Sequence, residues 1–567
     1  MALAANCLIQ RVKVVRRLWL LVPIAIAMIV VVPLCVVASM AGNDSSGAWE
    51  HLVDTRLLEY GLNTTVLATS VGVLALLFGV PTAWVVQMHD FPGKRIVSWA
   101  LVLPLAMPAY VAAYALTDLF QFSGPVQTWL RGATGWTRSD YWFPDLRTLP
   151  GAALILAGTL YPYVYLAARA AFASLPRSAL EASRTLGRGP AETFIRVALP
   201  LARPAIVAGL ALVVMETLAD FGAVEYCAVD TFATGIYRAW YGLDSQAAAA
   251  RLSVLLVIGV AILLLIEHAF RRRRMHHHDT HRGTLRVQSV LLGLKGWLTC
   301  LACCIPLVLG FLLPGGRLLF LAINRGDARP SGLIDYGVNS LTVGAVSGVV
   351  AVLLATCMVV IHRSVRTPTI SVLKTTTRYG YALPGPVIAI GVVSALAWSD
   401  RTINHTWAAV LGDGTSVGLL LSGSLFALFL GYQTRFLGVA IPIIDSGLAR
   451  INRRLDDAAR TLGASPLNVF LRVHLPILMA PMCVAGLFVF VDVIKELPAT
   501  LMLRPFNFDT LAVRVYQLAS EERLDEAATA ALVIVAIGTL PVLLVQRQLS
   551  FAQPREPSCA QIETDQR

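Results

Sequence analysis

Long apolar runs, separated by short polar segments, dominate the hydrophobicity pattern of this 567-residue chain. Each run covers roughly 18 to 25 residues, enough for an α-helix to cross a hydrocarbon layer about 30 Å thick. The pattern predicts about twelve transmembrane helices, at approximately 18–40, 64–87, 97–120, 151–173, 204–226, 250–270, 290–313, 340–361, 381–398, 416–438, 478–500 and 527–546. We therefore expect an all-α, polytopic membrane protein.

Composition supports this interpretation, because 56% of the residues are hydrophobic and only 14% are charged. Soluble domains average about 25% charged residues. The first apolar run is longer than the core of a signal peptide, so we expect it to persist as a membrane helix. The sequence has nine cysteines, and we interpret Cys300, Cys303 and Cys304, which share one run, as small packing residues rather than metal ligands.

The positive charges predict which loops face the cytoplasm. With the N-terminus inside, roughly 29 Lys and Arg residues fall in inner segments and roughly 11 in outer ones, as expected for inner loops. Both long basic loops, 174–203 and 439–477, and both termini are then cytoplasmic. The formal net charge of +12 thus reflects membrane orientation and gives no reason to expect nucleic-acid binding.

The second half of the sequence repeats the first at an offset of 276 residues. Tyr60-Gly61-x-Asn63, for example, recurs as Tyr336-Gly337-x-Asn339. An even number of spans per half predicts a parallel repeat about an axis along the membrane normal. We expect a first half at 1–270 with its core at 60–270, a linker at 271–289, a second half at 290–546 with its core at 336–546, and a cytoplasmic tail at 547–567.

The linker is strongly basic and contains four histidines, at His276, His277, His278 and His281. A metal sensor is one interpretation of these histidines. Because they are embedded among arginines on the cytoplasmic side, we favour a solvated basic segment that faces membrane lipid.

A basic, amphipathic loop occurs once in each half. Each copy has an acidic residue and two small residues, then a Gly after three more residues, then Val-x-Leu-Pro after nine more. These positions are Glu181, Ala182, Ser183, Gly187, Val197, Leu199 and Pro200 in the first copy, and Asp457, Ala458, Ala459, Gly463, Val473, Leu475 and Pro476 in the second. The Gly suits a helix C-terminus. We expect a short helix starting at Pro176 or Ser178 with Glu181 in its first turn, a turn, and a second helix running to Pro200 or Pro476.

This spacing resembles the EAA loop of the permeases of ATP-binding-cassette (ABC) importers, with 181–200 and 457–476 as the two loops. The departures are Ser183 for Ala, Asp457 for Glu, and Val for Ile in both copies. The resemblance implies a type I importer fold with two six-helix halves, and loops that dock on ATPase subunits, of which we expect two copies. It also implies a bacterial inner membrane protein.

The sequence contains no Walker A pattern. We therefore expect that this chain is not an enzyme, holds no cofactor and stably binds no metal, and that ATP and Mg bind to the partner ATPase. Because no soluble segment is long enough to bind a solute, we also expect a separate periplasmic or lipid-anchored solute-binding protein.

Carboxylates within the apolar runs are the candidate solute path. A charge at the bilayer centre costs about 2.5–3.5 kcal/mol, so such residues should face protein or water. Spacing of four places Glu216 with Asp220, and Asp492 with Glu496, on one face of each helix, and Lys495 is available to neutralise one of them. The alternative is structural pairing of these carboxylates, with Arg169, Arg251 or the backbone.

The segments 220–242 and 496–524 resemble the signatures of ferric-iron importer permeases, which implies iron transport. Ferric iron is a hard cation that prefers oxygen ligands, and the candidate path residues are Glu216, Asp220, Glu225, Tyr226, Asp492 and Glu496. We interpret Tyr161, Tyr163 and Tyr165 as interfacial anchors, with a place in the path as the alternative. Permeases for thiamine, aminoethylphosphonate, polyamines and sulfate share this fold.

Two other classes of function remain open on the sequence alone. Twelve spans in two parallel halves also describe a secondary transporter, but that class gives no reason for a duplicated docking loop. A membrane-embedded enzyme is the other, although no nucleophile–base or metal-ligand constellation stands out.

Overall fold

The computed structural model describes residues 2–42, 47–272, 289–325, 330–365, 367–412 and 416–551. The four linker histidines and most of the predicted C-terminal tail lie outside these residues. Eleven described helices are long and apolar enough to cross a membrane, and a bent helix pair gives a twelfth if it is counted as one span. The prediction of an all-α polytopic protein is therefore confirmed.

The longer helices of the first half are followed here by those of the second. The first set is α1 (Ala2–Met40), α3 (Leu57–Met88), α5 (Ala109–Phe120), α7 (Leu149–Ala173), α10 (Leu199–Ala219), α12 (Phe232–Tyr241) and α13 (Gln246–Arg272). The second set is α14 (Gly293–Leu307), α15 (Leu313–Arg325), α16 (Pro330–Ser364), α18 (Gly385–Leu411), α19 (Leu425–Ala449), α22 (Leu475–Lys495), α24 (Leu511–Ser520) and α25 (Leu524–Phe551).

Shorter elements connect these helices. They are α2 (Ala48–Thr55), α4 (Lys94–Ala100), η1 (Leu103–Ala106), α6 (Pro125–Thr134), α8 (Arg177–Thr185), α9 (Pro190–Thr193), η2 (Phe194–Ala198), α11 (Gly222–Tyr226), η3 (Val308–Leu312), α17 (Pro368–Arg378), η4 (Tyr379–Ala382), α20 (Arg453–Thr461), α21 (Pro466–Val469), η5 (Phe470–His474) and α23 (Pro498–Leu503). Two-residue strands, β1 (His89–Asp90) and β2 (Ser289–Val290), pair in parallel.

Three pairs of long and short helices start and end at matching positions in the two halves. The pairs α7 and α19, α8 and α20, and α10 and α22 have equal lengths and keep the 276-residue offset seen in the sequence. After α11 the offset grows by three residues, since α12 begins at Phe232 and α24 at Leu511. These elements thus repeat between the halves with a three-residue insertion in the second, whereas α5 and α6 of the first half correspond to the single long helix α18 of the second.

The predicted span 97–120 is not one straight helix. It breaks at Pro108, whose extended backbone separates η1 from α5, and the segments on either side are bent by 98°. The predicted span 381–398 likewise starts in η4 and breaks at Pro384 before α18. A proline disfavours helical backbone in the residue before it, so the paired prolines account for both breaks.

Three further expectations about helix ends were wrong. The predicted spans 204–226 and 478–500 instead occupy Pro190–Ala219 and Pro466–Lys495. The helices after the two turns therefore continue past Pro200 and Pro476, through the π-helical turns η2 and η5, into the membrane spans. Proline is tolerated there because each lies in the first turn of the following α-helix. Pro176 precedes the first residue of α8, which leaves Glu181 beyond its first turn.

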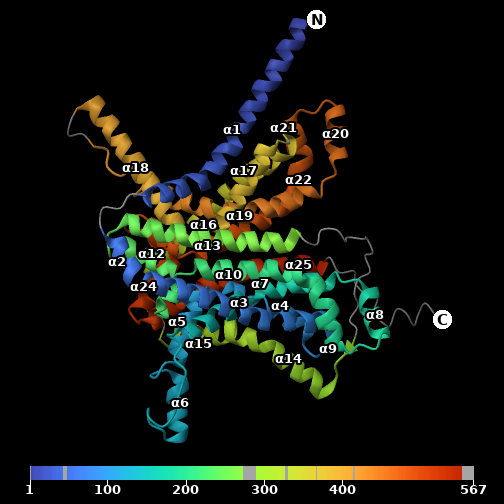
Figure 1. Cartoon of the computed structure of the whole chain (residues 1–567), viewed down its shortest axis with the longest axis vertical. Coiled ribbons are helices and arrows are strands. Elements are labelled where there is room, and N and C mark those ends of the chain that lie inside the picture. Colours follow the sequence, from blue (N-terminus) through green and yellow to red (C-terminus); the bar gives the residue numbers. More distant parts are fainter. Residues whose placement is uncertain are drawn as a thin grey trace, which may run out of the picture.

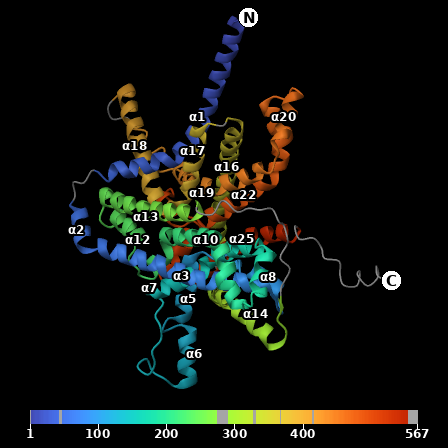
Figure 2. The same cartoon turned by 45° about the vertical axis from the view of Figure 1, so that its right-hand side comes forward.

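The first helix of each half packs on the other half. The helix α1 lies against α17 and α18, and Thr434 Oγ1 of α19 donates a hydrogen bond to Ile29 O at 3.0 Å. The helix α15 lies against α5 and α25 of opposite halves, and the Cα of Gly310 nearly touches Gly158 of α7. A Cβ on Gly310 would lie 1.8 Å from Gly158 O, so only glycine fits there. Figures 1 and 2 show α1 crossing above the first-half helices to reach α17 and α18.

The two docking-loop helices occupy the same side of the molecule. In Figure 1, α8 and α20 lie on the right, whereas α2, α12 and α24 lie on the left. The membrane spans α3, α7, α10, α13 and α25 run between the two sides. Below we call these the docking side and the opposite side.

Candidate functional site

The predicted carboxylates meet where α10 of the first half approaches α22 of the second. Glu216 and Asp492 lie in the last turn of these two helices, and Asp220 and Glu496 are the residues at which the helices end. All four line one cavity of about 130 Å³ between the halves. The sequence repeat therefore corresponds to a paired arrangement of carboxylates around a common space.

Arg435 of α19 connects carboxylates from the two halves. Its Nη1 donates to Glu496 Oε2 at 2.7 Å, and its Nη2 donates to Glu216 Oε2 at 3.5 Å. The Arg435 side chain is only 8% exposed. Since a buried charge must be paired, the guanidinium and the two carboxylates stabilise one another inside the protein.

Lys495 makes a second connection between the halves. Its Nζ lies 3.1 Å from Asp492 Oδ1 and donates to the carbonyl of Leu105, in η1 of the first half, at 3.4 Å. The expectation that Lys495 neutralises a carboxylate is consistent with this contact. The four carboxylates and two cations together carry a formal charge of −2.

Asp220 and Glu496 also accept hydrogen bonds from backbone N–H groups. Asp220 Oδ1 accepts hydrogen bonds from the N–H groups of Ala223 and Val224, at the start of α11. Glu496 Oε1 accepts from the N–H of Ala499 in α23. Both carboxylates thus shape the break that follows each helix. No group of three or more His, Cys, Asp or Glu residues in the described ranges has the geometry to hold a metal ion.

A second cavity, of about 640 Å³, adjoins the first on the docking side. The two cavities share Leu105, Tyr163, Tyr381, Asp492 and Lys495. The larger one is lined by Leu166 and Arg169 of α7, close to the start of the first docking loop, and by the segment from Gly438 to Ile443 of α19. The charged layer is therefore reached from the docking side.

Aromatic and aliphatic side chains close the opposite side. Phe221 and Leu497, which directly follow Asp220 and Glu496, line the smaller cavity and are each 1% exposed. The ring of Phe221 lies 4.7 Å from Tyr237 of α12 and 6.1 Å from Tyr516 of α24, measured between centroids. The cavities consequently extend from the charged layer toward the docking side, and packed side chains close the other side.

Sequence reasoning missed the principal partner of the carboxylates. Arg169 instead donates to the carbonyl of Ser98, and Arg251 to that of Ala41. Arg435 lies within the predicted span 416–438, where any intramembrane arginine signals a buried partner or a solute path. That signal was present in the sequence, but the first half offers only Thr159 at the matching position.

The three tyrosines of α7 are not at the lipid interface. Tyr161 and Tyr165 are fully buried, and their hydroxyls donate to the carbonyls of Leu101 and Ser98. Tyr163 lines both central cavities. The interpretation of these residues as interfacial anchors was wrong, because α7 is enclosed by neighbouring helices.

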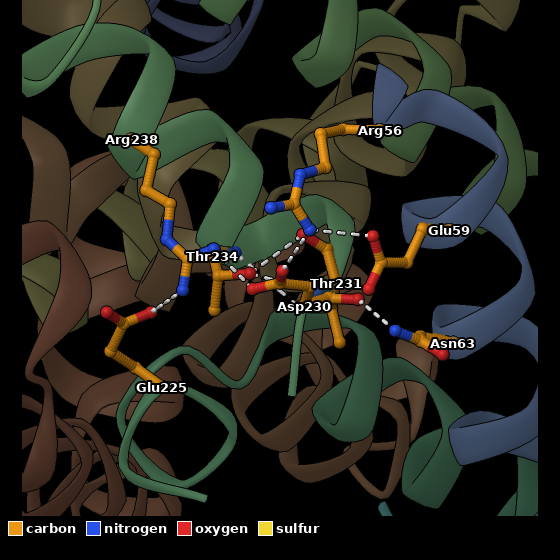
Figure 3. A network of polar contacts seen from close by, with 8 residues as sticks. All are labelled: Arg56, Glu59, Asn63, Glu225, Asp230, Thr231, Thr234 and Arg238. Atoms are coloured by element: carbon orange, nitrogen blue, oxygen red, sulfur yellow. Dashed lines mark hydrogen bonds and ion pairs between the residues drawn. The ribbon is translucent and has the colours of Figure 1, made fainter. Parts of the chain in front are cut away.

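Glu225 and Tyr226 lie away from the central cavities. Glu225 Oε2 is 3.6 Å from Arg238 Nη2, within the polar network shown in Figure 3. The Tyr226 hydroxyl accepts a hydrogen bond from Arg147 Nη2 at 3.3 Å. The six predicted path residues therefore separate into a central group of four and an outlying pair.

The repeated Tyr-Gly-x-Asn motif anchors the loops that precede α12 and α24. Asn63 Nδ2 donates to the carbonyl of Asp230 at 3.0 Å, and Asn339 Nδ2 donates to that of Asp509 at the same distance. Figure 3 shows Asn63 of α3 reaching Asp230, whose carboxylate also binds Arg238. In each half this contact holds the loop before α12 or α24 against the first core helix.

The first docking loop has an exposed surface and a buried attachment. Glu181, Ala182 and Leu186 are exposed, whereas Leu180 and Ser183 are buried. Ser183 Oγ forms a hydrogen bond of 2.9 Å with Thr193 Oγ1, which joins α8 to α9. The matching residues of the second loop, Ala459 and Val469, are apolar. The serine that replaces Ala at position 183 is therefore accompanied by a threonine to which it can bond.

Both docking helices end at a glycine in the left-handed region. Gly187 and Gly463 each have φ of +79°, and no atom lies within 4 Å of the position a Cβ would take. The predicted C-terminal glycines are thus required by backbone conformation and not by space. Leu186 and Leu462, just before them, are 76% and 87% exposed.

Charged side chains attach the second docking loop to α16. Asp456, in the first turn of α20, accepts hydrogen bonds from Arg363 Nε of α16 and pairs with His474 Nε2 of η5, both at 2.8 Å. Arg363 also donates to the carbonyls of Leu448 and Ile451. Burial alone would raise the pKa of Asp456, but the hydrogen bonds and charges of Arg363 and His474 outweigh it and hold the pKa below its ordinary value.

The corresponding attachment in the first half is uncharged. Gln87, Leu180 and Ala198 stand at the positions of Arg363, Asp456 and His474. Leu180 and Ala198 are both buried. The two docking loops therefore have the same backbone and different internal chemistry.

Comparisons with known proteins agree with this architecture. Residues 75–275 match the family described as binding-protein-dependent transport system inner membrane component. The Fe(3+)-transport system permease protein FbpB 2 of Haemophilus influenzae is 25% identical over 508 residues, which cover 88% of this chain and 91% of that protein.

Two shorter relatives match less than half of the chain. The sulfate transport system permease protein CysT of Escherichia coli is 28% identical over 43% of this chain and 87% of its own length. A probable sulfate transport system permease protein cysT of Helicosporidium is 30% identical over 35% of this chain and 70% of its own length. Together with the family match and the helical repeat, these relatives show that the chain belongs to the binding-protein-dependent inner membrane components, the permease family of ABC importers.

Proposed function

We propose that this chain carries ferric iron across the bacterial inner membrane, by alternating access, as the permease subunit of an ATP-driven importer. The observation that carries the proposal is the charged layer between the halves, in which Glu216, Asp220, Asp492 and Glu496 exceed the two cations by two formal charges. The relative matched along nearly the whole chain is named a Fe(3+)-transport permease. Carboxylate oxygens are suitable ligands for a hard trivalent cation in passage.

The two docking loops support coupling to a separate ATPase. Each carries an exposed acidic residue within a short helix and an exposed leucine directly after that helix, Glu181 and Leu186 in the first loop and Asp457 and Leu462 in the second. An exposed apolar side chain that recurs at matching positions suits a pocket on a partner protein. We assign these surfaces to two ATPase subunits, which bind ATP and Mg on the cytoplasmic side, and the opposite face to a solute-binding protein.

Iron uptake by whole cells tests the solute assignment. We expect Glu216→Gln combined with Asp492→Asn to lower ferric uptake at least tenfold while the complex with the ATPase still copurifies. Glu225→Gln, which removes the same chemical group outside the central cavities, should retain most uptake. Equal loss in both variants would contradict a path through the central layer, and wild-type uptake of sulfate in place of iron would contradict the solute.

Copurification tests the docking assignment. Leu186→Asp and Leu462→Asp should each weaken retention of the ATPase, whereas Leu419→Asp, at a 71% exposed leucine between α18 and α19, should not. Uptake that persists after ATP depletion and stops when the proton gradient collapses would instead indicate a secondary transporter.

A further inference from the structure

Arg435 occupies the position that a transported cation needs. It lies between one carboxylate from each half, and its side chain is almost completely buried. The same residue lines the smaller cavity together with all four carboxylates. Its Nε has no hydrogen-bond partner although it is buried, so the guanidinium is not fully satisfied by its present neighbours.

The contacts of Arg435 also bear on closure of the path. Glu216 is in α10 of the first half, whereas Arg435 and Glu496 belong to α19 and α22 of the second. The salt bridge to Glu216 therefore ties the halves together in the same cavity that Phe221 and Leu497 line. Separating α10 from α22 would lengthen the 3.5 Å contact to Glu216 first, because the contact to Glu496 is internal to the second half.

We propose that Arg435 is a tethered substitute for the cation, which neutralises Glu216 and Glu496 in the resting permease and is displaced by the solute ion when the path opens. This inference rests on the proposed cation transport. This role explains why a path with four carboxylates contains a buried arginine. The salt bridges of Arg435 are exchangeable, so the carboxylates remain available to bind the solute ion. An incoming trivalent ion competes for the same oxygens, and the released guanidinium keeps a place over the rings of Tyr381 and Phe436, 5.9 and 5.7 Å from their centroids.

An oxyanion path would use the same arginine in the opposite way. There the guanidinium would bind the anion directly, and the surrounding carboxylates would repel it. The excess of carboxylates at this layer favours the tethered-cation role, and removal of Arg435 distinguishes the two roles because they predict opposite changes in ion binding.

The test measures terbium binding to the purified permease–ATPase complex in lipid nanodiscs, with Tb³⁺ as the trivalent probe. Emission is excited through tyrosine, and Tyr163 and Tyr381 line the cavity. The Arg435→Gln complex should have one Tb³⁺ site per chain whose affinity is at least tenfold higher than that of the same site in the wild type. Adding Glu216→Gln and Glu496→Gln should abolish that site. Arg435→Lys, which keeps the charge, should behave as the wild type does.

A second readout depends on closure alone. Arg435→Gln and Glu216→Gln should both raise ATP hydrolysis in the absence of the solute-binding protein, since each removes the tie between the halves. Unchanged Tb³⁺ binding in an Arg435→Gln complex that still assembles with its ATPase would overturn the proposal. If Tb³⁺ binding is unchanged but the wild type still takes up iron, only the proposal about Arg435 fails and the proposed function stands. Sulfate binding by the wild type that is lost in Arg435→Gln would overturn both the Arg435 proposal and the proposed function.

Discussion

Replacing Arg363 by methionine should loosen the second docking loop and leave the first one intact. The change removes the donor to Asp456 and the donors to the carbonyls of Leu448 and Ile451, at 2.8, 2.7 and 3.0 Å. The Arg363 and Asp456 side chains are 9% and 11% exposed, so water replaces these contacts poorly. Methionine retains the apolar stem, which confines the change to the polar contacts.

The expected loss follows from the contacts that are removed. A hydrogen bond to a charged group contributes about 1.5–3 kcal/mol, and each unsatisfied buried carbonyl costs about 1–3 kcal/mol. We take the lower bound of this range, about 1 kcal/mol, for each carbonyl. The total is about 3.5–5 kcal/mol, in the range found when one partner of a buried ion pair is removed.

Hydrogen–deuterium exchange of the full complex measures this loss locally. A change of about 3.5–5 kcal/mol in the free energy of opening should accelerate exchange across 448–461 by roughly 400- to 5,000-fold. Exchange across 172–185 should not change. The matched control is Gln87→Met, at the corresponding position of the first half, which should accelerate exchange in neither loop by more than about tenfold. Equal exchange of 448–461 in wild type and Arg363→Met would refute the claim that these ions hold the second loop.

Three further outcomes follow from the docking loops and their neighbours. Gly187→Val should destabilise its loop by about 1–2 kcal/mol, because φ of +79° is strained for a branched residue, and Gly187→Asn should recover part of the ATPase binding lost on copurification. Asn63→Ala and Asn339→Ala should each lower the melting temperature measured by scanning fluorimetry, through loss of one hydrogen bond of about 1 kcal/mol between a helix and a loop, and should do so additively. Asp456→Asn should destabilise the second loop at neutral pH, and by less in acid: the pKa of Asp456 is depressed on folding, so its contribution is fully present above the ordinary carboxyl value of 3.8 and is lost as pH falls through the lower folded pKa. If the difference in exchange of 448–461 between wild type and Asp456→Asn is the same at pH 7 and at pH 3, the depressed pKa of Asp456 is contradicted.

The sequence predicted those features that depend on local pattern or on repetition. Apolar runs located the membrane helices, and the constant offset identified Asp492 as the counterpart of Glu216, with which it lines one cavity. The glycines after the docking helices were found because left-handed backbone is a local requirement. Helix breaks at Pro108 and Pro384 were equally local, but the long hydrophobic runs around them concealed the bends.

Features that depend on distant pairing were not predicted. Arg435 has no charged counterpart in the first half, so the repeat gave no indication of its contact with Glu216, 219 positions away in the chain. The exchange of first helices between halves is also invisible to hydropathy, because α1 is equally apolar whichever half it contacts. The continuation of α10 and α22 through π-helical turns depends on packing around Pro200 and Pro476 and not on helix propensity.

The exchanged first helices have a consequence for biosynthesis. Thr434, which binds the carbonyl of Ile29, is 405 positions farther along the chain. At a synthesis rate of about 5–20 residues per second, α1 leaves the ribosome roughly 20–80 s before its final neighbour. During that interval it must persist in lipid without its partner, and its segment Trp19–Met40 has a mean hydropathy of 3.0, the highest among the candidate spans in the described ranges. The helix α19 is synthesised later and has a mean hydropathy of 1.4 and an arginine near its centre. It enters a bilayer in which most of the helices that contact it have already been inserted.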